Sequence, residues 1–241
     1  MTSYKLTVRG DERVAFVGKT GSGKTFAALH LCRDLRRLVV CDPKGTIDVR
    51  KWRLQPYDIG RERNPSVQEF AEGKAGRFLL RAPIRGVTRY ETWEEYLGEL
   101  WEIGRLTLYI DEVYGVQPVG SKPGDNLSAF YTRGREREVG TWAATQRPAW
   151  VPMFTLSEAE WLFVFRLQLA KDRSRMVEMI GPAVEQRIPD IHGLWLYNAL
   201  WDRPLYAPSL NIGPSDIAAD VEQGVAQEAL VEEAKGGANI V

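Results

Sequence analysis

A glycine-rich octapeptide constrains this chain more than any other sequence feature. It reads Gly18-Lys-Thr-Gly-Ser-Gly-Lys24-Thr25 and fits the pattern G-x-x-x-x-G-K-[ST] in full. An apolar run, Arg13-Val-Ala-Phe-Val17, precedes it, and an amphipathic stretch follows it. A buried strand, a tight turn and a helix account for this order. The sequence therefore predicts a strand–loop–helix unit at the start of the fold.

The chemistry of this loop indicates a phosphate ligand. Its glycines let the backbone curl so that N–H groups point inward, and the following helix adds its positive N-terminal end. Lys24 is expected to reach the terminal phosphates as a catalytic group, and the Thr25 hydroxyl to ligate Mg²⁺. We therefore predict ATP and Mg²⁺ as cofactors. The predicted binding residues are Gly18, Lys19, Thr20, Gly21, Ser22, Gly23, Lys24 and Thr25.

A pair of adjacent carboxylates supplies the second half of the predicted site. The apolar run 106–110 ends in Asp111-Glu112, as a Walker B strand does. Asp111 is expected to hold Mg²⁺ through water, as the metal partner of Thr25. Glu112 is expected to polarise the attacking water as a general base. This pairing favours hydrolysis over phosphoryl transfer to a small acceptor.

The alternation of apolar runs with amphipathic stretches predicts an α/β fold. Over residues 1–207 the pattern is typical of a domain built on a largely parallel sheet. We expect a RecA-like P-loop NTPase with a central, mostly parallel sheet flanked by helices. Predicted strands span 13–17, 38–41, 77–81, 106–110, 141–145, 161–165 and 194–200, the last paired as a hairpin with 205–206. Predicted helices span 24–36, 88–105, 127–139 and 172–180, the first burying Phe26, Leu29 and Leu35. Residues 42–76 give no clear pattern.

The end of the chain differs in composition from the rest. From Ala207 onward there is one basic residue against six acidic ones. We expect residues 208–241 to be an acidic tail, mobile or docked on a partner, with an amphipathic helix near 217–235. No apolar run approaches the roughly 20 residues needed to cross a bilayer, and Met1 to Gly10 lacks a secretory core. Membrane insertion and export are therefore not expected.

Charge and cysteine content exclude several classes of protein. Lys and Arg number 32, as do Asp and Glu, so a strongly basic protein that coats nucleic acid is not expected. Twelve basic residues against five acidic ones within residues 1–55 still allow a focused basic patch. The two cysteines, Cys32 and Cys41, are too few for a disulfide framework and are predicted to be buried thiols.

Other P-loop classes fit less well. No N-K-x-D or T-K-x-D motif is present for a GTPase, and residues 26–105 hold no L-S-G-G-Q-like signature for an ABC ATPase. A nucleotide kinase remains an alternative, because Arg133, Arg135 and Arg137 could form an arginine-rich lid.

Three further segments carry a resemblance to a known superfamily. They are Asp42-Pro-Lys-Gly45, Gly134-Arg135-Glu-Arg137-Glu-Val-Gly140 and Ala144-Thr-Gln146-Arg-Pro148. Together with the two phosphate motifs they resemble the FtsK–HerA superfamily of ring-forming, DNA-pumping ATPases over about residues 13–150. The resemblance implies that Gln146, on a strand beside that of Asp111, contacts the γ-phosphate or its water. It also implies that Arg135, or as second choice Arg137, acts as a finger on a neighbouring subunit's nucleotide.

The small size of the chain narrows the resemblance to one group within this superfamily. A chain with little beyond the core is most similar to the genome-packaging ATPases of tailless, internal-membrane icosahedral viruses. This implies ATP-driven translocation of double-stranded DNA by a homo-oligomeric ring, expected to be a hexamer. We expect it in the host cytoplasm or on the virion, with a capsid vertex or a membrane protein as a further partner.

Two loops are candidates for gripping DNA, and other functions remain open. The candidate loops are 115–126, with Lys122, and 83–89, with Arg85 and Arg89. Lysine and arginine there would face the phosphates of the duplex. The alternatives are another motor of the same superfamily, for conjugation or chromosome handling, or a non-motor P-loop kinase or assembly factor.

Overall fold

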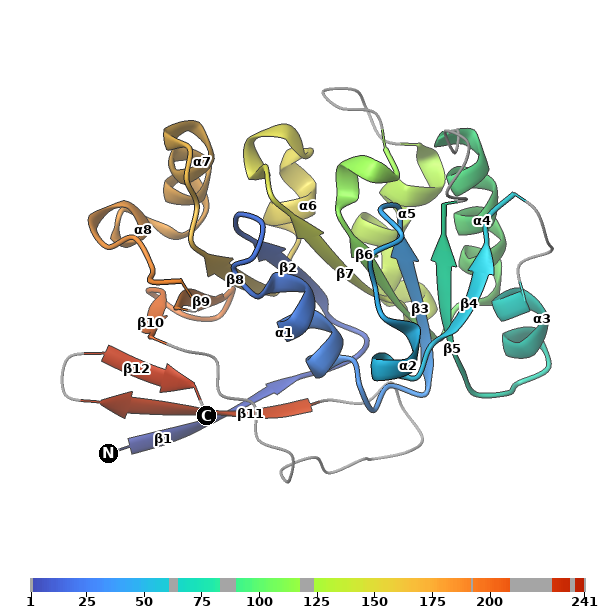
Figure 1. Ribbon diagram of the computed structural model, residues 1–241, viewed down its shortest axis with the longest axis horizontal. Coiled ribbons are helices and arrows are strands. Elements are labelled where there is room, and N and C mark those ends of the chain that lie inside the picture. The colour runs from blue at the N-terminus through green and yellow to red at the C-terminus, as the bar shows by residue number, and fades with distance from the viewer. Residues whose placement is uncertain are drawn as a thin grey trace.

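A nine-stranded sheet forms the centre of the structure (Figure 1). The computed structural model describes residues 2–60, 65–82, 90–117, 124–191, 193–208, 227–234 and 237–240. The strand order is β10-β9-β8-β2-β7-β6-β3-β5-β4. The bounds are β2 Arg13–Val17, β3 Arg37–Asp42, β4 Gln55–Asp58, β5 Gly76–Arg81, β6 Thr107–Asp111, β7 Gly140–Thr145, β8 Trp161–Phe165, β9 Leu194–Asn198 and β10 Leu205–Ala207.

The sheet is mostly parallel, as the sequence predicts. All neighbours from β8 to β4 pair in parallel, and β9 and β10 add an antiparallel edge. Every residue of β6, β7 and β8 is buried, which explains why these strands do not alternate between apolar and charged residues in the sequence. The predicted hairpin at the end of the sheet is confirmed by the pairing of β10 with β9.

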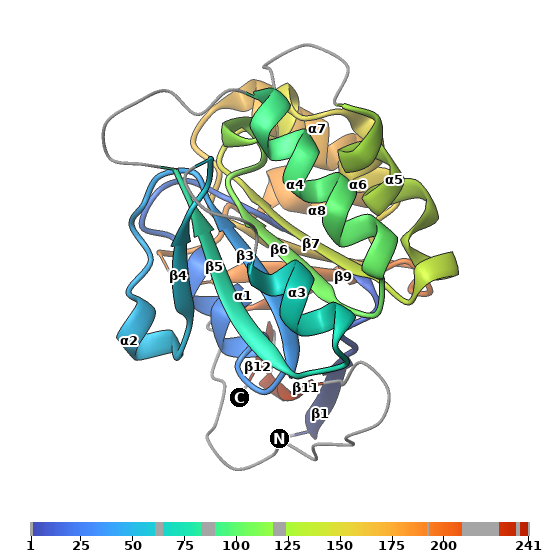
Figure 2. The same ribbon diagram turned by 90° about the vertical axis from the view of Figure 1, so that its right-hand side faces the viewer.

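Helices cover both faces of the sheet (Figures 1 and 2). Helices α1 and α2 lie on one face, and α3 to α8 lie on the other. The bounds are α1 Lys24–Leu31, α2 Val49–Trp52, α3 Pro65–Ala71, α4 Tyr90–Ile103, α5 Asp125–Arg133, α6 Met153–Ser157, α7 Ala170–Ile180 and α8 Ala183–Gln186. Three short 3₁₀ helices are η1 Val113–Gly115, η2 Gly134–Arg137 and η3 Pro148–Trp150. Among the described residues, no helix is long and apolar enough to span a membrane.

Alternation along each strand divides the core into two layers. Phe16 on β2 faces the α1 side, where its ring stacks on Phe163 of β8 at 4.8 Å between centroids. Ala15 and Val17, one residue away on either side, belong to the layer under α3 to α8. Successive side chains of a strand point to opposite faces, so each central strand contributes to both layers.

The first helix is shorter than the sequence predicts. It ends at Leu31 rather than Arg36, and Arg77 on β5 donates to the carbonyls of Cys32 and Leu35 at 2.7 and 2.9 Å. These bonds satisfy carbonyl groups that a longer helix would have used internally. The prediction of a buried Phe26 is wrong. Its side chain is 50% exposed and packs edge-on against Trp52 of α2.

Short elements fill the segments without a clear sequence pattern. Residues 42–76 hold α2, β4 and α3, and the N-terminal segment Thr2–Val8 forms β1. β1 pairs antiparallel with β11 (Gln227–Ala234), which pairs with β12 (Gly237–Ile240) in a separate sheet. The predicted helix near 217–235 is therefore wrong over Gln227–Ala234, and its other residues lie outside the described ones. Pairing with a strand edge can override local helix preference.

The two phenylalanines of the P-loop unit give a test of this packing. Phe16→Ala should lower the free energy of unfolding by about 3–5 kcal/mol, because it empties a fully buried ring site. Phe26→Ala should lower it by less than about 1 kcal/mol, because half of that side chain is already in solvent. Urea titration followed by far-UV circular dichroism measures both. Equal losses would contradict the assignment of these residues to core and surface.

Candidate functional site

The site lies where the central parallel strands end together. Val17, the last residue of β2, pairs with Thr145 on β7, and Asp111 of β6 pairs with Ala144. The residues that follow each strand therefore meet at one edge of the sheet. β7 lies between β2 and β6, so Gln146 follows a strand that borders Asp111, as the sequence predicts.

The glycines of the loop each meet a steric or conformational demand. A side chain on Gly18 would place its Cβ 2.6 Å from Cβ of Phe165, so β8 passes too close for any other residue. Gly21 and Gly23 have φ values of 76° and 99°, in the region that disfavours residues with a side chain. Gly23 is the residue from which α1 begins. The loop therefore turns directly into the N-terminus of a helix, a natural anion-binding arrangement.

Lys24 is a buried cation at the centre of the site. Its Nζ donates to the carbonyl of Lys19 at 2.9 Å, across the mouth of the loop, and the residue is only 7% exposed. Burial lowers the pKa of Lys24 to about 8, although the carboxylates of Glu112 and Asp111 act in the opposite direction. A cation with so little solvent interacts strongly with an incoming phosphate.

Oxygen atoms that could hold Mg²⁺ lie on Thr25, next to Lys24, and on Asp111. The Thr25 Oγ1 donates to Asp111 Oδ1 at 2.7 Å, and the buried Tyr109 hydroxyl donates to the same oxygen at 2.6 Å. Mg²⁺ prefers hard oxygen ligands, and commonly takes one or two from the protein and the rest from phosphate and water. Thr25 and Asp111 fit that role. Among the described residues, no cluster of three or more His, Cys, Asp or Glu side chains could hold a metal ion.

Tyr109 is a contributor that the sequence analysis missed. It stands two residues before Asp111 on β6, so both side chains point to the same face of the sheet. Its hydroxyl fixes the orientation of the carboxylate through the 2.6 Å bond. Burial and the charge of Asp111 raise the pKa of Tyr109 well above its usual value, so the group stays a donor. A tyrosine inside an otherwise aliphatic strand, two residues before an acid, is the signal that could have indicated it.

Glu112 is almost fully buried and occupies a strained position. Its φ of 91° is rare for a residue with a side chain, and only 3% of the residue is exposed. Such conformations cost about 1–3 kcal/mol and concentrate at functional sites. Oε1 accepts from the backbone N–H of Gln146 at 3.2 Å, and Oε2 lies 2.9 Å from Nζ of Lys44. Burial and the Glu112 carboxylate raise the pKa of Tyr114 to about 12.

Gln146 contacts both the glycine-rich loop and Glu112. Its side-chain Oε1 accepts a hydrogen bond from the Thr20 hydroxyl of the glycine-rich loop at 2.6 Å. Its backbone N–H donates to Glu112, as noted above. The structure thus brings together five predicted residues from three strand ends: Lys24, Thr25, Asp111, Glu112 and Gln146.

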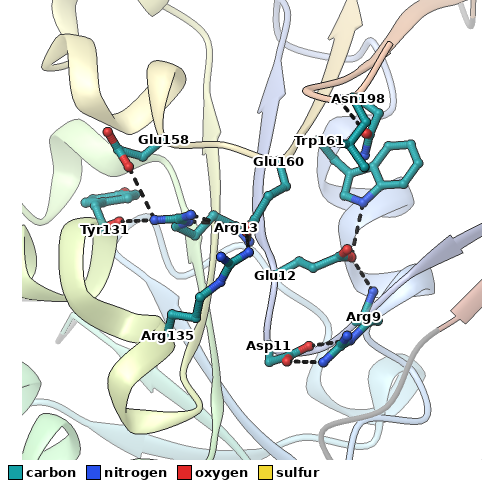
Figure 3. Close-up of polar contacts among 11 residues, drawn as sticks. Arg9, Asp11, Glu12, Arg13, Tyr131, Arg135, Glu158, Glu160, Trp161 and Asn198 are labelled. Carbon is teal, nitrogen blue, oxygen red and sulfur yellow. Dashed lines mark hydrogen bonds and ion pairs between the residues drawn. The ribbon is translucent and has the colours of Figure 1, made fainter.

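The structure does not bring the two candidate arginine fingers to this site. Arg135 lies at the opposite edge of the sheet, where Figure 3 shows Arg135 and Arg13 converging on Glu160. Arg135 Nη2 is 3.0 Å from Glu160 Oε1, and its side chain is 81% exposed. Arg13, at the start of β2, also pairs with Glu160 and Glu158.

Arg137 is held more firmly than Arg135. Its guanidinium donates to the carbonyl of Glu102 at 3.1 Å and to the Glu102 carboxylate at 3.2 Å, at the C-terminal end of α4. It also lies 5.8 Å from the ring centroid of Trp101. These contacts hold the Arg137 side chain against the C-terminal end of α4, whereas the Arg135 side chain projects into solvent.

The loops predicted to grip DNA lie largely outside the described residues. Residues 83–89, with Arg85 and Arg89, are outside them, and so are residues 118–123, with Lys122.

Comparison with known proteins supports one class of protein. No known family profile matches the chain. The DNA packaging ATPase P9 of Enterobacteria phage PRD1 is 29% identical over 179 residues, which are 73% of this chain and 73% of that protein.

Solved structures give the same result for the fold. The genome packaging NTPase B204 of Sulfolobus turreted icosahedral virus 2, solved in complex with the ATP analogue AMPPCP, superposes with a TM-score of 0.66 at 14% identity. That match covers 84% of this chain and all of the viral one. VirB4 of Thermoanaerobacter pseudethanolicus gives a TM-score of 0.59 at 10% identity, over 84% of this chain and 90% of that one. The chain thus has the P-loop NTPase fold, and the predicted resemblance to FtsK–HerA-type viral genome-packaging ATPases is confirmed.

Proposed function

We propose that this protein is a viral genome-packaging ATPase that couples ATP hydrolysis to movement of double-stranded DNA. The observation that carries the proposal is the linked site at the sheet edge. There the Thr25 hydroxyl donates a hydrogen bond to Asp111 at 2.7 Å, and the backbone N–H of Gln146 donates one to the Glu112 carboxylate at 3.2 Å. The similarity to the packaging ATPase of phage PRD1 over 73% of the chain supports the choice of substrate.

Each group of the site has a defined task in hydrolysis. The N–H groups of the glycine-rich loop and the Lys24 ammonium bind the phosphates and neutralise their charge. A bound Mg²⁺, held by Thr25 and Asp111, would supply further charge neutralisation. Glu112 accepts a proton from the water that attacks the γ-phosphorus, while the bond to the β–γ bridging oxygen breaks and ADP leaves.

Gln146 is suited to report the state of the nucleotide. Its amide contacts Thr20 in the glycine-rich loop, and its N–H contacts Glu112. Loss of the terminal phosphate would change the environment of both contacts, while Gln146 itself stays uncharged. β7 would transmit the change to the opposite edge of the sheet, where η2 carries Arg135.

The position of Arg135 favours action on a neighbouring subunit. Gly18 follows Arg13 by five positions along β2, a distance of about 16 Å at the usual rise of a strand. Arg135 therefore cannot reach its own P-loop but is exposed for contact with another subunit. We assign the finger to Arg135, in a ring expected to be hexameric. The motor would occupy residues 1–207, working in the host cytoplasm or on the virion.

Replacing the proposed general base should separate binding from turnover. Glu112→Gln should retain ATP binding and lower kcat by about 10²–10⁴-fold, because an amide cannot accept the proton of water. Isothermal titration calorimetry and a phosphate-release assay measure the two properties. Turnover at the wild-type rate would remove Glu112 from this role.

Mixing two inactive variants tests the trans-acting arginine. Arg135→Ala subunits keep an intact P-loop, and Lys24→Ala subunits keep an intact Arg135, so mixed rings can form complete interfaces. In an equal mixture, random assembly gives complete interfaces at about a quarter of the positions. The ATPase rate of the mixture should therefore exceed that of either variant alone.

The control for this experiment is Arg105→Ala. Arg105 is 76% exposed, pairs with Glu138 and lies on the same edge of the sheet. This variant should retain the wild-type ATPase rate by itself. A mixture of Arg135→Ala and Lys24→Ala with no recovery would argue against a finger in trans.

A further inference from the structure

The turn after β3 is built by a buried carboxylate. Asp42 is fully buried, and its carboxylate accepts from the backbone N–H groups of Lys44, Gly45 and Ile47 at 3.2, 2.9 and 2.8 Å. Gly45 has a φ of 66°, which a turn of this shape requires. The turn thus places Lys44 at a defined point on the same edge of the sheet as the P-loop.

The neighbouring proline seats this turn against the segment that carries Glu112. A side chain on Gly115 would place its Cβ 2.5 Å from Cγ of Pro43, so the two segments are in direct contact. Gly115 in turn donates its N–H to the carbonyl of Glu112 at 2.9 Å. Asp42, Pro43 and Gly45 therefore act together to bring Lys44 beside Glu112.

Lys44 reaches the buried carboxylate from the solvent side. Its Nζ is 2.9 Å from Glu112 Oε2, and the side chains are 36% and 3% exposed. A buried carboxylate needs such a partner, because an unpaired charge at that depth is costly. The charge of Lys44 also acts on Lys24, where it adds to the lowering of the pKa by burial. The charges of Lys44, Glu112 and Asp111 all act on Lys24, so the four groups occupy one region of the site.

A terminal phosphate bound by Lys24 would enter that same space. It carries more negative charge than a carboxylate, and the flexible four-carbon stem of lysine lets its ammonium change partner. We propose that Lys44 is a second cation that binds the terminal phosphate. It pairs with Glu112 in the geometry described and moves to the γ-phosphate when ATP is bound. The move leaves Glu112 Oε2 facing the attacking water. ADP lacks the γ-phosphate and so leaves the Lys44–Glu112 pair intact.

The preference for ATP over ADP tests this exchange. Lys44→Met keeps an unbranched side chain but removes the charge. It should weaken binding of a non-hydrolysable ATP analogue about tenfold, since a charge-assisted hydrogen bond is lost, while ADP affinity stays within about twofold. Lys44→Arg should keep most of the preference. Isothermal titration calorimetry with both nucleotides gives the ratio of affinities.

The control is a lysine in an exposed ion pair away from the site. Lys74 is 56% exposed and lies 2.6 Å from Glu72, so Lys74→Met should change neither affinity. If Lys44 has only a structural role, its replacement should weaken the binding of the ATP analogue and of ADP equally, or leave both affinities unchanged. Either result would overturn the proposal.

A double-mutant cycle isolates the competition between Glu112 and phosphate. Glu112→Gln alone should tighten binding of the ATP analogue, because Lys44 then loses its competing partner. In the Lys44→Met background the same substitution should give no gain from this source. Equal tightening in both backgrounds would show that Lys44 does not exchange partners, and would overturn the proposal.

The inference rests on the proposed function only for ATP binding and hydrolysis. These measurements need neither DNA nor a ring. A protein that shows the predicted ATP preference but no response to DNA would refute packaging and leave the role of Lys44 standing. A wild-type protein that binds no ATP would overturn both.

Discussion

The parallel register of β2, β7 and β6 is the constraint on which the site depends. It pairs Val17 with Thr145 and Asp111 with Ala144, so the glycine-rich loop, Gln146 and the two carboxylates leave the sheet at one level. Each strand is buried on both faces, and a shift by one residue would exchange its two core-facing sets of side chains. Core packing therefore fixes the position of the catalytic groups, although none of them belongs to the core.

Burial gives the site its electrostatic character. Asp42, Asp111, Glu112 and Lys24 are all less than 10% exposed, where charges interact strongly and need partners. Burial raises the pKa of Asp42 even though three backbone N–H bonds act to lower it. The positive charges of Lys24 and Lys44 offset the negative charges of Asp111 and Glu112. Both cations already have a partner, Lys24 the carbonyl of Lys19 and Lys44 the carboxylate of Glu112, so a bound triphosphate must change these contacts.

The sequence predicts those parts of the molecule in which local pattern and tertiary environment agree. The buried strands β2 and β8 have the predicted bounds, and the two acids at the end of β6 and the amide after β7 lie where strand ends must converge. Phe26 was predicted to be buried because it occupies the apolar pattern of α1. The buried apolar residues of this helix are instead Ala27, Ala28, Leu29 and Leu31, so the prediction for Leu29 is confirmed.

Other features depend on contacts that no local pattern encodes. The ion pair of Lys44 requires Pro43 to pack against Gly115, more than 70 residues later in the chain. The strand Gln227–Ala234 exists through its pairing with Thr2–Val8 at the other end of the sequence. The location of Arg135 at the far edge of the sheet follows from the direction of β7, and it is consistent with the finger role implied by resemblance.

We propose that ATP hydrolysis by this protein takes place in a DNA-moving assembly and not in an isolated subunit. The most direct test is the steady-state ATPase rate per subunit as a function of protein concentration, with and without long double-stranded DNA. The rate should rise with concentration, because Arg135 must come from a neighbour, and should rise again when DNA is added. A rate that is independent of both would contradict it and would indicate a monomeric P-loop enzyme.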